Sequence, residues 1–192
     1  MKNYLVLILL LIADILFVSC NKSEVADHVL PIRSELPLYS YTIDSEKFEG
    51  KIDNIEELVT ADPFIIQSEE ELQAFFDKVD ELLGTNPLRT LPEYTTFNFL
   101  KHTVILKFFF HGYHPSKLRE TESYFFSKDY LSDQFKSEGY SYYYSQICSF
   151  KAHHLDDDGI FISLSGIVVD KIPNDKKVMG VINFTVSDGW DD

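Results

Sequence analysis

The sequence predicts an α+β fold, with a mostly antiparallel sheet of about five or six strands and one main amphipathic helix packed on a face. Two observations predict it. An apolar stripe at helical spacing occurs early in the chain, and runs of β-branched and aromatic residues joined by short turn sequences follow it. Strands joined by short turns pair antiparallel, and a lone amphipathic helix needs an apolar surface to cover.

The main helix begins after Ser68 and ends at Gly84. Ser68 and Glu71 have the spacing of a capping box, in which the hydroxyl and the carboxylate each bind the other residue's amide. Gly84 is the residue type that ends helices in the left-handed conformation. The stripe consists of Leu72, Phe75, Phe76, Val79, Leu82 and Leu83. These residues predict a helix whose apolar face is structural.

The other elements follow from composition and turn residues. A short helix is expected at 52–59, before Asp62-Pro63. We expect the long strand at 139–153 to form a hairpin with the strand at 160–169, because residues 155–159 have turn chemistry. The candidate strand segments, in order, are 38–43, 64–66, 103–111, 124–126, 139–153, 160–169 and 178–186, with 64–66 and 124–126 the short ones; the tally expected is about five or six strands.

The segment at 139–153 alternates with period two, which separates two faces of one strand. One face carries Tyr140, Tyr142, Tyr144, Cys148 and Phe150, and the other carries Ser141, Tyr143, Ser145, Ser149 and Lys151. Packing of the sheet does not obviously need a ring at Tyr143. A candidate platform of rings for a glycan or a peptide is therefore expected, with Tyr143 and Tyr113 as its candidate binding residues. The rings of this platform are Tyr140, Tyr142, Tyr143, Tyr144, Phe108, Phe109 and Phe110. The alternative is that aromatic residues simply fill both faces of the sheet.

Residues 1–20 have the pattern of a targeting segment. An apolar run over residues 4–18 follows Lys2. The run is too short to span a membrane, and Asp14 interrupts it, so it predicts a signal peptide. The end of the run, Leu16-Phe17-Val18-Ser19-Cys20, resembles a bacterial lipobox, although Phe17 replaces the commoner leucine. The resemblance implies cleavage before Cys20, acylation of that residue and a palmitate-bearing lipoprotein held to a membrane. The alternative is an ordinary secretory signal with an incidental cysteine.

These observations divide the chain into three parts. We expect a signal peptide at 1–19, a lipidated tether at 20–36 and a single α+β domain at 37–192. Asn21 after the lipidated cysteine implies the outer membrane, with the domain facing the periplasm or the cell surface. Once Cys20 carries lipid, Cys148 is the remaining one of the two cysteines, and its apolar neighbours predict a buried filler of a strand rather than a nucleophile.

The charge of the chain excludes some partners. With 17 Lys and Arg against 31 Asp and Glu, the net charge is −14. A nucleic-acid partner would need a basic stripe, and docking on anionic lipid by charge would need basic clusters. We therefore expect the membrane, through the lipid anchor, and a protein or a glycan as partners, and no nucleic acid.

No sequence motif commits the chain to a reaction or a cofactor. Phosphate-binding loops, nucleophile elbows and zinc-protease helices do not occur in it. Histidines and aspartates at predicted strand ends are candidates for metal binding, with polar loop ends as the alternative: His111, His114, His153, His154 and Asp156. We expect a noncatalytic module without a cofactor; the alternative is a hydrolytic enzyme with two distant carboxylates or a metal-binding protein.

Three segments carry a resemblance to a known family. Residues 64–72, 97–105 and 139–141 resemble the C-terminal domain of PrcB-like protease-complex-assembly proteins and related lipoproteins of the Bacteroidota. In such domains a strand and a serine-capped helix precede a second strand and a glycine-tyrosine strand opening. Here Asn98 stands where an acidic residue is usual, and Glu138 where a second glycine is. The resemblance covers roughly residues 64–150 and implies a noncatalytic interaction role.

Overall fold

The computed structural model of the chain describes residues 28–43, 52–84, 86–111, 115–152 and 160–188. These residues form seven strands in two sheets together with helices, so the predicted α+β class is confirmed. The inner sheet has the order β1-β6-β3-β2, and the outer sheet has the order β4-β5-β7. Their bounds are β1 (Ile32–Ile43), β2 (Phe64–Ile66), β3 (His102–His111), β4 (Pro115–Ser127), β5 (Tyr140–Ala152), β6 (Ile160–Asp170) and β7 (Lys177–Asp188).

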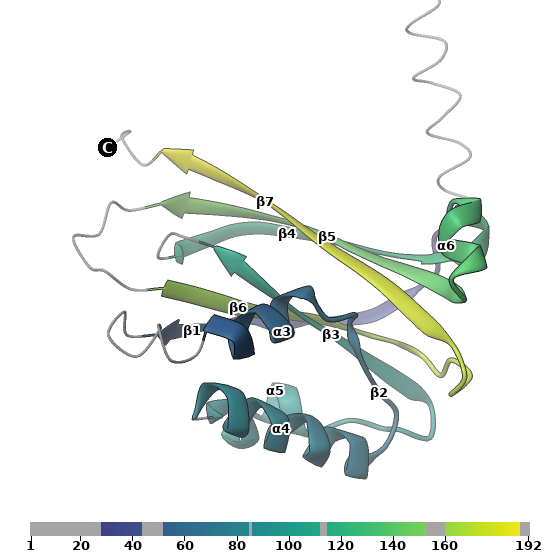
Figure 1. Cartoon of the computed structure of the whole chain (residues 1–192), viewed down its shortest axis with the longest axis horizontal. Coiled ribbons are helices and arrows are strands. Elements are labelled where there is room, and N and C mark those ends of the chain that lie inside the picture. Colours follow the sequence, from purple (N-terminus) through teal and green to yellow (C-terminus); the bar gives the residue numbers. More distant parts are fainter. Residues whose placement is uncertain (1–27, 44–51, 85, 112–114, 153–159, 189–192) are drawn as a thin grey trace, which may run out of the picture.

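The molecule has three layers (Figure 1). The helices within residues 52–95 lie on one side of the inner sheet and the outer sheet lies on the other, whereas the short helix at 133–137 lies at one end of the outer sheet. Two apolar cores hold the layers together, because the inner sheet is buried on both faces. The helices are α3 (Ile52–Thr60), α4 (Glu69–Leu83), η2 (Pro87–Thr90), α5 (Pro92–Thr95), η3 (Lys128–Tyr130) and α6 (Asp133–Ser137).

The predicted hairpin between 139–153 and 160–169 is wrong. β5 pairs with β4 and with β7 in the outer sheet, whereas β6 pairs with β1 and β3 in the inner sheet. The physical reason is the composition of β6, which is apolar on both faces. Leu164 packs toward the helices and Ile167 toward the outer sheet, and both are 0% exposed. Such a strand belongs in the middle of a covered sheet rather than at its edge.

The outer sheet also departs from the expected antiparallel order. β5 pairs antiparallel with β4 but parallel with β7. A parallel pair needs a crossover connection, and β6 in the inner sheet is part of that connection. The tally of strands and the number of sheets therefore differ from the prediction, although the fold class does not.

The main helix forms as the sequence predicts. The hydroxyl of Ser68 accepts a hydrogen bond from the Glu71 amide at 3.2 Å, and Gly84 ends the helix with φ 82°. The Glu71 carboxylate accepts from the Gln67 amide at 2.6 Å, one residue before the partner that a capping box would use. Five of the six predicted stripe residues are buried; Leu83 is partly buried.

The described chain enters the fold along β4. The Leu30 amide donates to the Phe125 carbonyl at 2.6 Å, and the Ser127 amide donates to the His28 carbonyl at 3.1 Å. β1 then begins at Ile32, well before the predicted start of the first strand. Part of the range predicted as a tether therefore belongs to the folded part, because its backbone pairs with strands of both sheets.

Candidate functional site

The solvent side of the outer sheet carries the candidate site. On β5 the side chains of Tyr144, Gln146 and Cys148 point inward and are at most 1% exposed. Alternation therefore directs Tyr143 and Ile147 outward. Directly opposed residues of neighbouring strands share a face, which extends this surface onto β4 and β7. We call it the outer face and define it by Tyr124, Phe126, Tyr130, Tyr143, Ile147, Met179 and Val181.

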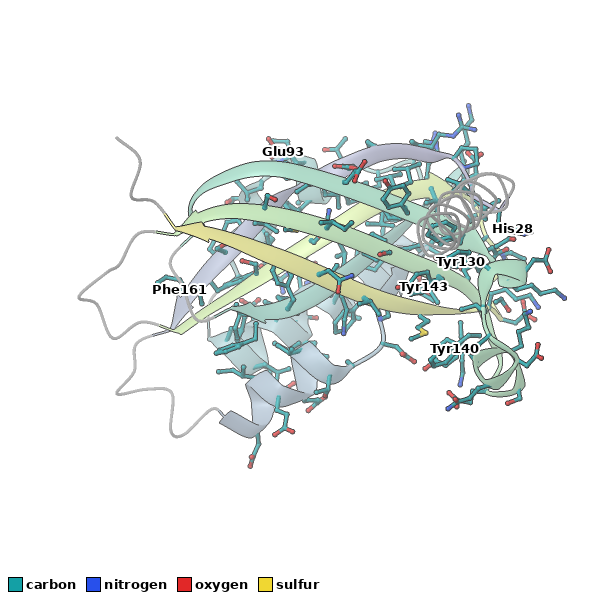
Figure 2. The ribbon with its side chains drawn as sticks, turned by 90° about the horizontal axis from the view of Figure 1, so that it is seen from above. His28, Glu93, Tyr130, Tyr140, Tyr143 and Phe161 are labelled. Atoms are coloured by element: carbon teal, nitrogen blue, oxygen red, sulfur yellow. The ribbon has the colours of Figure 1, made fainter. Side chains whose placement is uncertain are left out.

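Four aromatic rings of the outer face stack on one another. The ring centroids of Phe126 and Tyr130 are 4.0 Å apart, with planes at 12°. Tyr143 lies 5.8 Å from Phe126 and 5.7 Å from Tyr130, and Figure 2 shows Tyr130 and Tyr143 together on this side. Tyr124 stacks on Phe126 from the other direction, at 5.9 Å. The four rings thus form one aromatic cluster with nearly parallel planes.

Short helix η3 determines which ring of the cluster meets solvent. It follows β4 directly and brings Tyr130 back over the end of that strand. Phe126 is consequently only 4% exposed, whereas Tyr130 is 41% exposed. Tyr130 therefore has one ring side on Phe126 and remains available for a contact from outside.

Few charges accompany these rings. Among the described side chains of the three outer strands, Glu122 is the acidic group on this face, opposite Ile147. A hydrogen bond between Tyr124 and the Glu122 carboxylate raises the pKa of the Tyr124 hydroxyl. Lys177 lies at the rim, 5.7 Å from the ring centroid of Tyr140. In a chain of net charge −14, such a surface is unusual because it is nearly uncharged.

The arrangement suits binding rather than chemistry. Rings supply a large rigid contact area, and tyrosine hydroxyls add a polar group that remains hydrated.

The chain matches no protein-family model, no curated protein and no solved structure. Within the described residues, no helix has the length and apolar character needed to cross a membrane.

Only some of the site residues predicted from the sequence lie among the residues that the structure describes. Tyr143 points outward, as predicted, and belongs to the aromatic cluster. The rest of the predicted platform is partly wrong: Tyr144, Phe108 and Phe109 are at most 5% exposed, because they face the cores between the layers. Candidates outside the described residues remain predictions: Tyr113, His114, His153, His154 and Asp156. The backbone of His111 ends β3, but its side chain is also outside the described part.

Sequence reasoning missed Phe126 and Tyr130. The signal that could have found Phe126 is the alternation of Tyr124, Phe125 and Phe126, which puts the outer two on one face. Nothing in the sequence indicates that Tyr130 returns over β4, because that contact depends on the turn made by η3.

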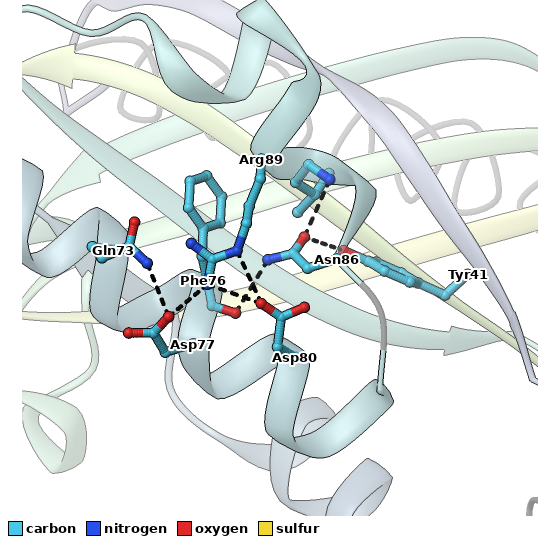
Figure 3. A network of polar contacts seen from close by, with 8 residues as sticks. Tyr41, Gln73, Phe76, Asp77, Asp80, Asn86 and Arg89 are labelled. Atoms are coloured by element: carbon cyan, nitrogen blue, oxygen red, sulfur yellow. Dashed lines mark hydrogen bonds and ion pairs between the residues drawn. The ribbon is translucent and has the colours of Figure 1, made fainter.

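A charged cluster on the helix side is structural (Figure 3). Arg89 binds Asp77 at 2.5 Å and Asp80 at 2.8 Å, which joins η2 to α4. The Arg89 hydrogen bond holds the pKa of the Asp77 carboxyl below its usual range. Nearby, Asn86 accepts from the Leu88 amide and donates to the Phe76 carbonyl. These groups satisfy one another, and the described residues hold no group of three metal-ligating side chains.

The buried thiol has the role that the sequence predicts. Cys148 is 0% exposed between the sheets, and its Sγ donates to the Gln146 side-chain oxygen at 3.3 Å. Burial raises the pKa of the Cys148 thiol to about 12, so the thiolate needed for nucleophilic attack does not form near neutral pH. The same oxygen of Gln146 accepts from Ser165, which also pairs with the Tyr144 hydroxyl at 2.8 Å.

Two carboxylates line one groove of the described chain. It runs between β1 and the segment after α5, and Glu35 and Glu93 both line it. Both residues are exposed, and Glu35 accepts a hydrogen bond from the Thr121 hydroxyl at 3.0 Å. Neither carboxylate is buried, as a general acid in an apolar pocket would be.

Proposed function

We propose that this chain is a lipid-anchored envelope protein whose folded part is a noncatalytic binding module, with the outer face as its binding surface. The observation that carries the proposal is the aromatic cluster of the outer face, where Tyr130 and Tyr143 lie 5.7 Å apart and Tyr130 is 41% exposed. Aromatic anchors surrounded by few charges are typical of the centres of binding surfaces.

Two further points support a binding role. The resemblance of residues 64–150 to PrcB-like domains implies an interaction module. The groove that holds Glu35 and Glu93 supports the hydrolytic alternative less well, because both carboxylates are in contact with solvent. A protein and a glycan are the two partner classes that a ring surface with hydroxyl groups suits.

The binding surface is tested with matched substitutions in the full chain. Tyr143→Ala and Tyr130→Ala each remove a ring of the outer face, and Leu100→Ala removes a side chain that is 93% exposed elsewhere. Binding to cell-wall glycan is measured by co-sedimentation, and contact with envelope proteins by a photo-crosslinking residue at position 147, where Ile147 is 40% exposed on the same face. We expect each tyrosine substitution to weaken binding by about 30-fold, the loss typical of a hot-spot residue. Equal binding by all three variants contradicts the proposal.

The anchor is tested separately. Cells producing the wild-type chain or Cys20→Ala are grown with radioactive palmitate, and the protein is recovered and counted. We expect incorporation in the wild type and its loss in Cys20→Ala, because the proposed acylation needs that thiol. Equal incorporation in both rejects the lipoprotein assignment and, with it, the envelope location at the outer membrane.

A further inference from the structure

We infer that the partner of the outer face is the membrane surface that holds the lipid anchor, so that the domain lies on the bilayer by its aromatic cluster. This inference rests on the proposed lipidation of Cys20, and it gives the proposed binding surface a membrane partner in place of the protein or glycan partner considered above. Its structural basis is one juxtaposition: the described chain starts directly beside the aromatic cluster, on the same face.

The first step concerns where the described chain starts. Val29 forms an antiparallel bridge with Phe126, and directly opposed residues share a face, so Val29 joins the outer face. Its side chain is 38% exposed. Figure 2 shows His28 at the same end of the molecule as Tyr130 and Tyr143. The segment that leads toward Cys20 therefore leaves the fold at the aromatic cluster and not at the helix layer.

The second step is the reach of that segment. Seven residues lie between Cys20 and His28, and the eight steps from one Cα to the other span about 29 Å at most when the chain is fully extended. An acylated Cys20 lies at the bilayer surface, so this side of the domain stays within that distance of the headgroups. Tethering at such range gives a local concentration in the millimolar region, at which even weak contacts are populated.

The third step is the chemistry of the face. Tyrosine is enriched at the membrane interface, where its ring enters the apolar boundary and its hydroxyl stays among the headgroups. Tyr130 and Tyr143 offer rings and hydroxyls, and Val29 and Ile147 add exposed apolar area of 38% and 40%. The surface is one face of a sheet, which fits a flat partner better than a small ligand.

The fourth step is the distribution of charge. Helices α3 and α4, on the far side of the inner sheet (Figure 1), carry nine acidic side chains and one lysine. The outer face has Glu122, and near Tyr130 the opposite charges of Lys128 and Asp129 offset each other. An anionic lipid surface repels the helix layer and not the outer face. Charge therefore favours the same orientation as the tether and the rings.

The test locates the outer face relative to the bilayer. The full acylated chain with Trp190→Phe is reconstituted into vesicles of phosphatidylcholine containing brominated phosphatidylcholine, whose bromines quench nearby tryptophan. Two variants each add one reporter: Tyr130→Trp on the outer face and Ala74→Trp at an exposed position of α4. Circular dichroism confirms that both variants fold, and mass spectrometry confirms acylation.

We expect strong quenching for Tyr130→Trp and none for Ala74→Trp, and loss of the Tyr130→Trp quenching when Cys20→Ala is added. Absence of quenching for Tyr130→Trp in the acylated protein, or equal quenching for both reporters, overturns the inference while leaving the anchor in place. Glycan or protein binding at Tyr143 without quenching assigns the face to that partner instead. An unacylated Cys20 overturns both the anchor and this inference.

Discussion

The helix-covered face of the inner sheet and the outer face of the outer sheet are both rich in aromatic rings, and they differ in what covers them. Phe108 lies on the covered face, is 0% exposed, and has its ring centroid 6.2 Å from those of Phe64 and Phe75. Tyr130 lies on the outer face with a comparable ring contact, yet it is 41% exposed. Aromatic content therefore does not distinguish a core from a binding surface; the presence of a covering layer does.

The two sides also differ in charge. The helix layer carries acidic side chains on its solvent side, which is the ordinary pattern for an amphipathic helix over a core. The outer face has rings where that pattern would put charges. Exposed apolar surfaces are typical of binding sites, which is why we propose the outer face as the binding surface.

The largest expected effect comes from the covered face. Phe108→Ala removes a ring that is fully enclosed by helices and sheet, and we expect it to lower the free energy of unfolding by about 3–5 kcal/mol. Urea unfolding followed by circular dichroism measures the change. A loss no greater than that of Tyr130→Ala would show that the two faces are not energetically distinct.

The next expected effect, intermediate in size, is a loss of stability at alkaline pH that depends on groups buried between the two sheets. Burial raises the pKa of Cys148 from 9.0 to about 12 and also raises the pKa of Tyr144. Above pH 9 the unfolded chain loses the thiol proton while the folded chain keeps it, so stability is complete below that pH and falls as pH rises toward 12. For this one proton the expected slope is about 1.4 kcal/mol per pH unit.

Urea unfolding at a series of alkaline pH values measures the slope in the wild type and in Cys148→Ala. The variant should show a shallower decline, because it lacks the thiol and keeps the tyrosines. An identical decline in both proteins would mean that Cys148 ionises as easily in the folded state as in the unfolded one.

The smallest expected effect on stability comes from the outer face. Tyr130→Ala removes a half-exposed ring that stacks on Phe126, and we expect a loss of about 1 kcal/mol or less. The measurement is the same urea unfolding. A loss approaching that of Phe108→Ala would mean that Tyr130 is part of the core, and the binding role of the outer face would lose its basis.

Some elements could be read from the sequence because their causes are local. The main helix has its cap, its stripe and its terminal glycine within one segment, and all three act as expected except that the Glu71 carboxylate binds the Gln67 amide instead of the Ser68 amide. Alternation in β5 likewise placed Tyr143 outside and Cys148 inside, because side-chain direction in a strand depends only on position parity. The candidate site was thus half predicted, through Tyr143.

The remaining features depend on contacts between distant segments. In sequence, β6 resembles the second strand of a hairpin. In the structure it lies inside the inner sheet, and both of its faces are buried because helices cover one side and the outer sheet covers the other. Gln67 precedes the main helix, and its side-chain amide donates a hydrogen bond at 2.7 Å to the carbonyl of Ile172, which is far away in the chain. Neither arrangement has a local signal, because each is decided by a partner far away in the chain.

By itself the sequence determined the α+β class, the main helix, the buried thiol and the outward direction of Tyr143, since periodicity and capping act over a few residues. The tertiary structure alone decided the two-sheet arrangement, the parallel pairing of β5 with β7 and the stacking of Tyr130 on Phe126. It also decided that the described chain enters beside the aromatic cluster. The physical reason is that burial is a property of the whole packed molecule, whereas side-chain alternation is a property of each segment.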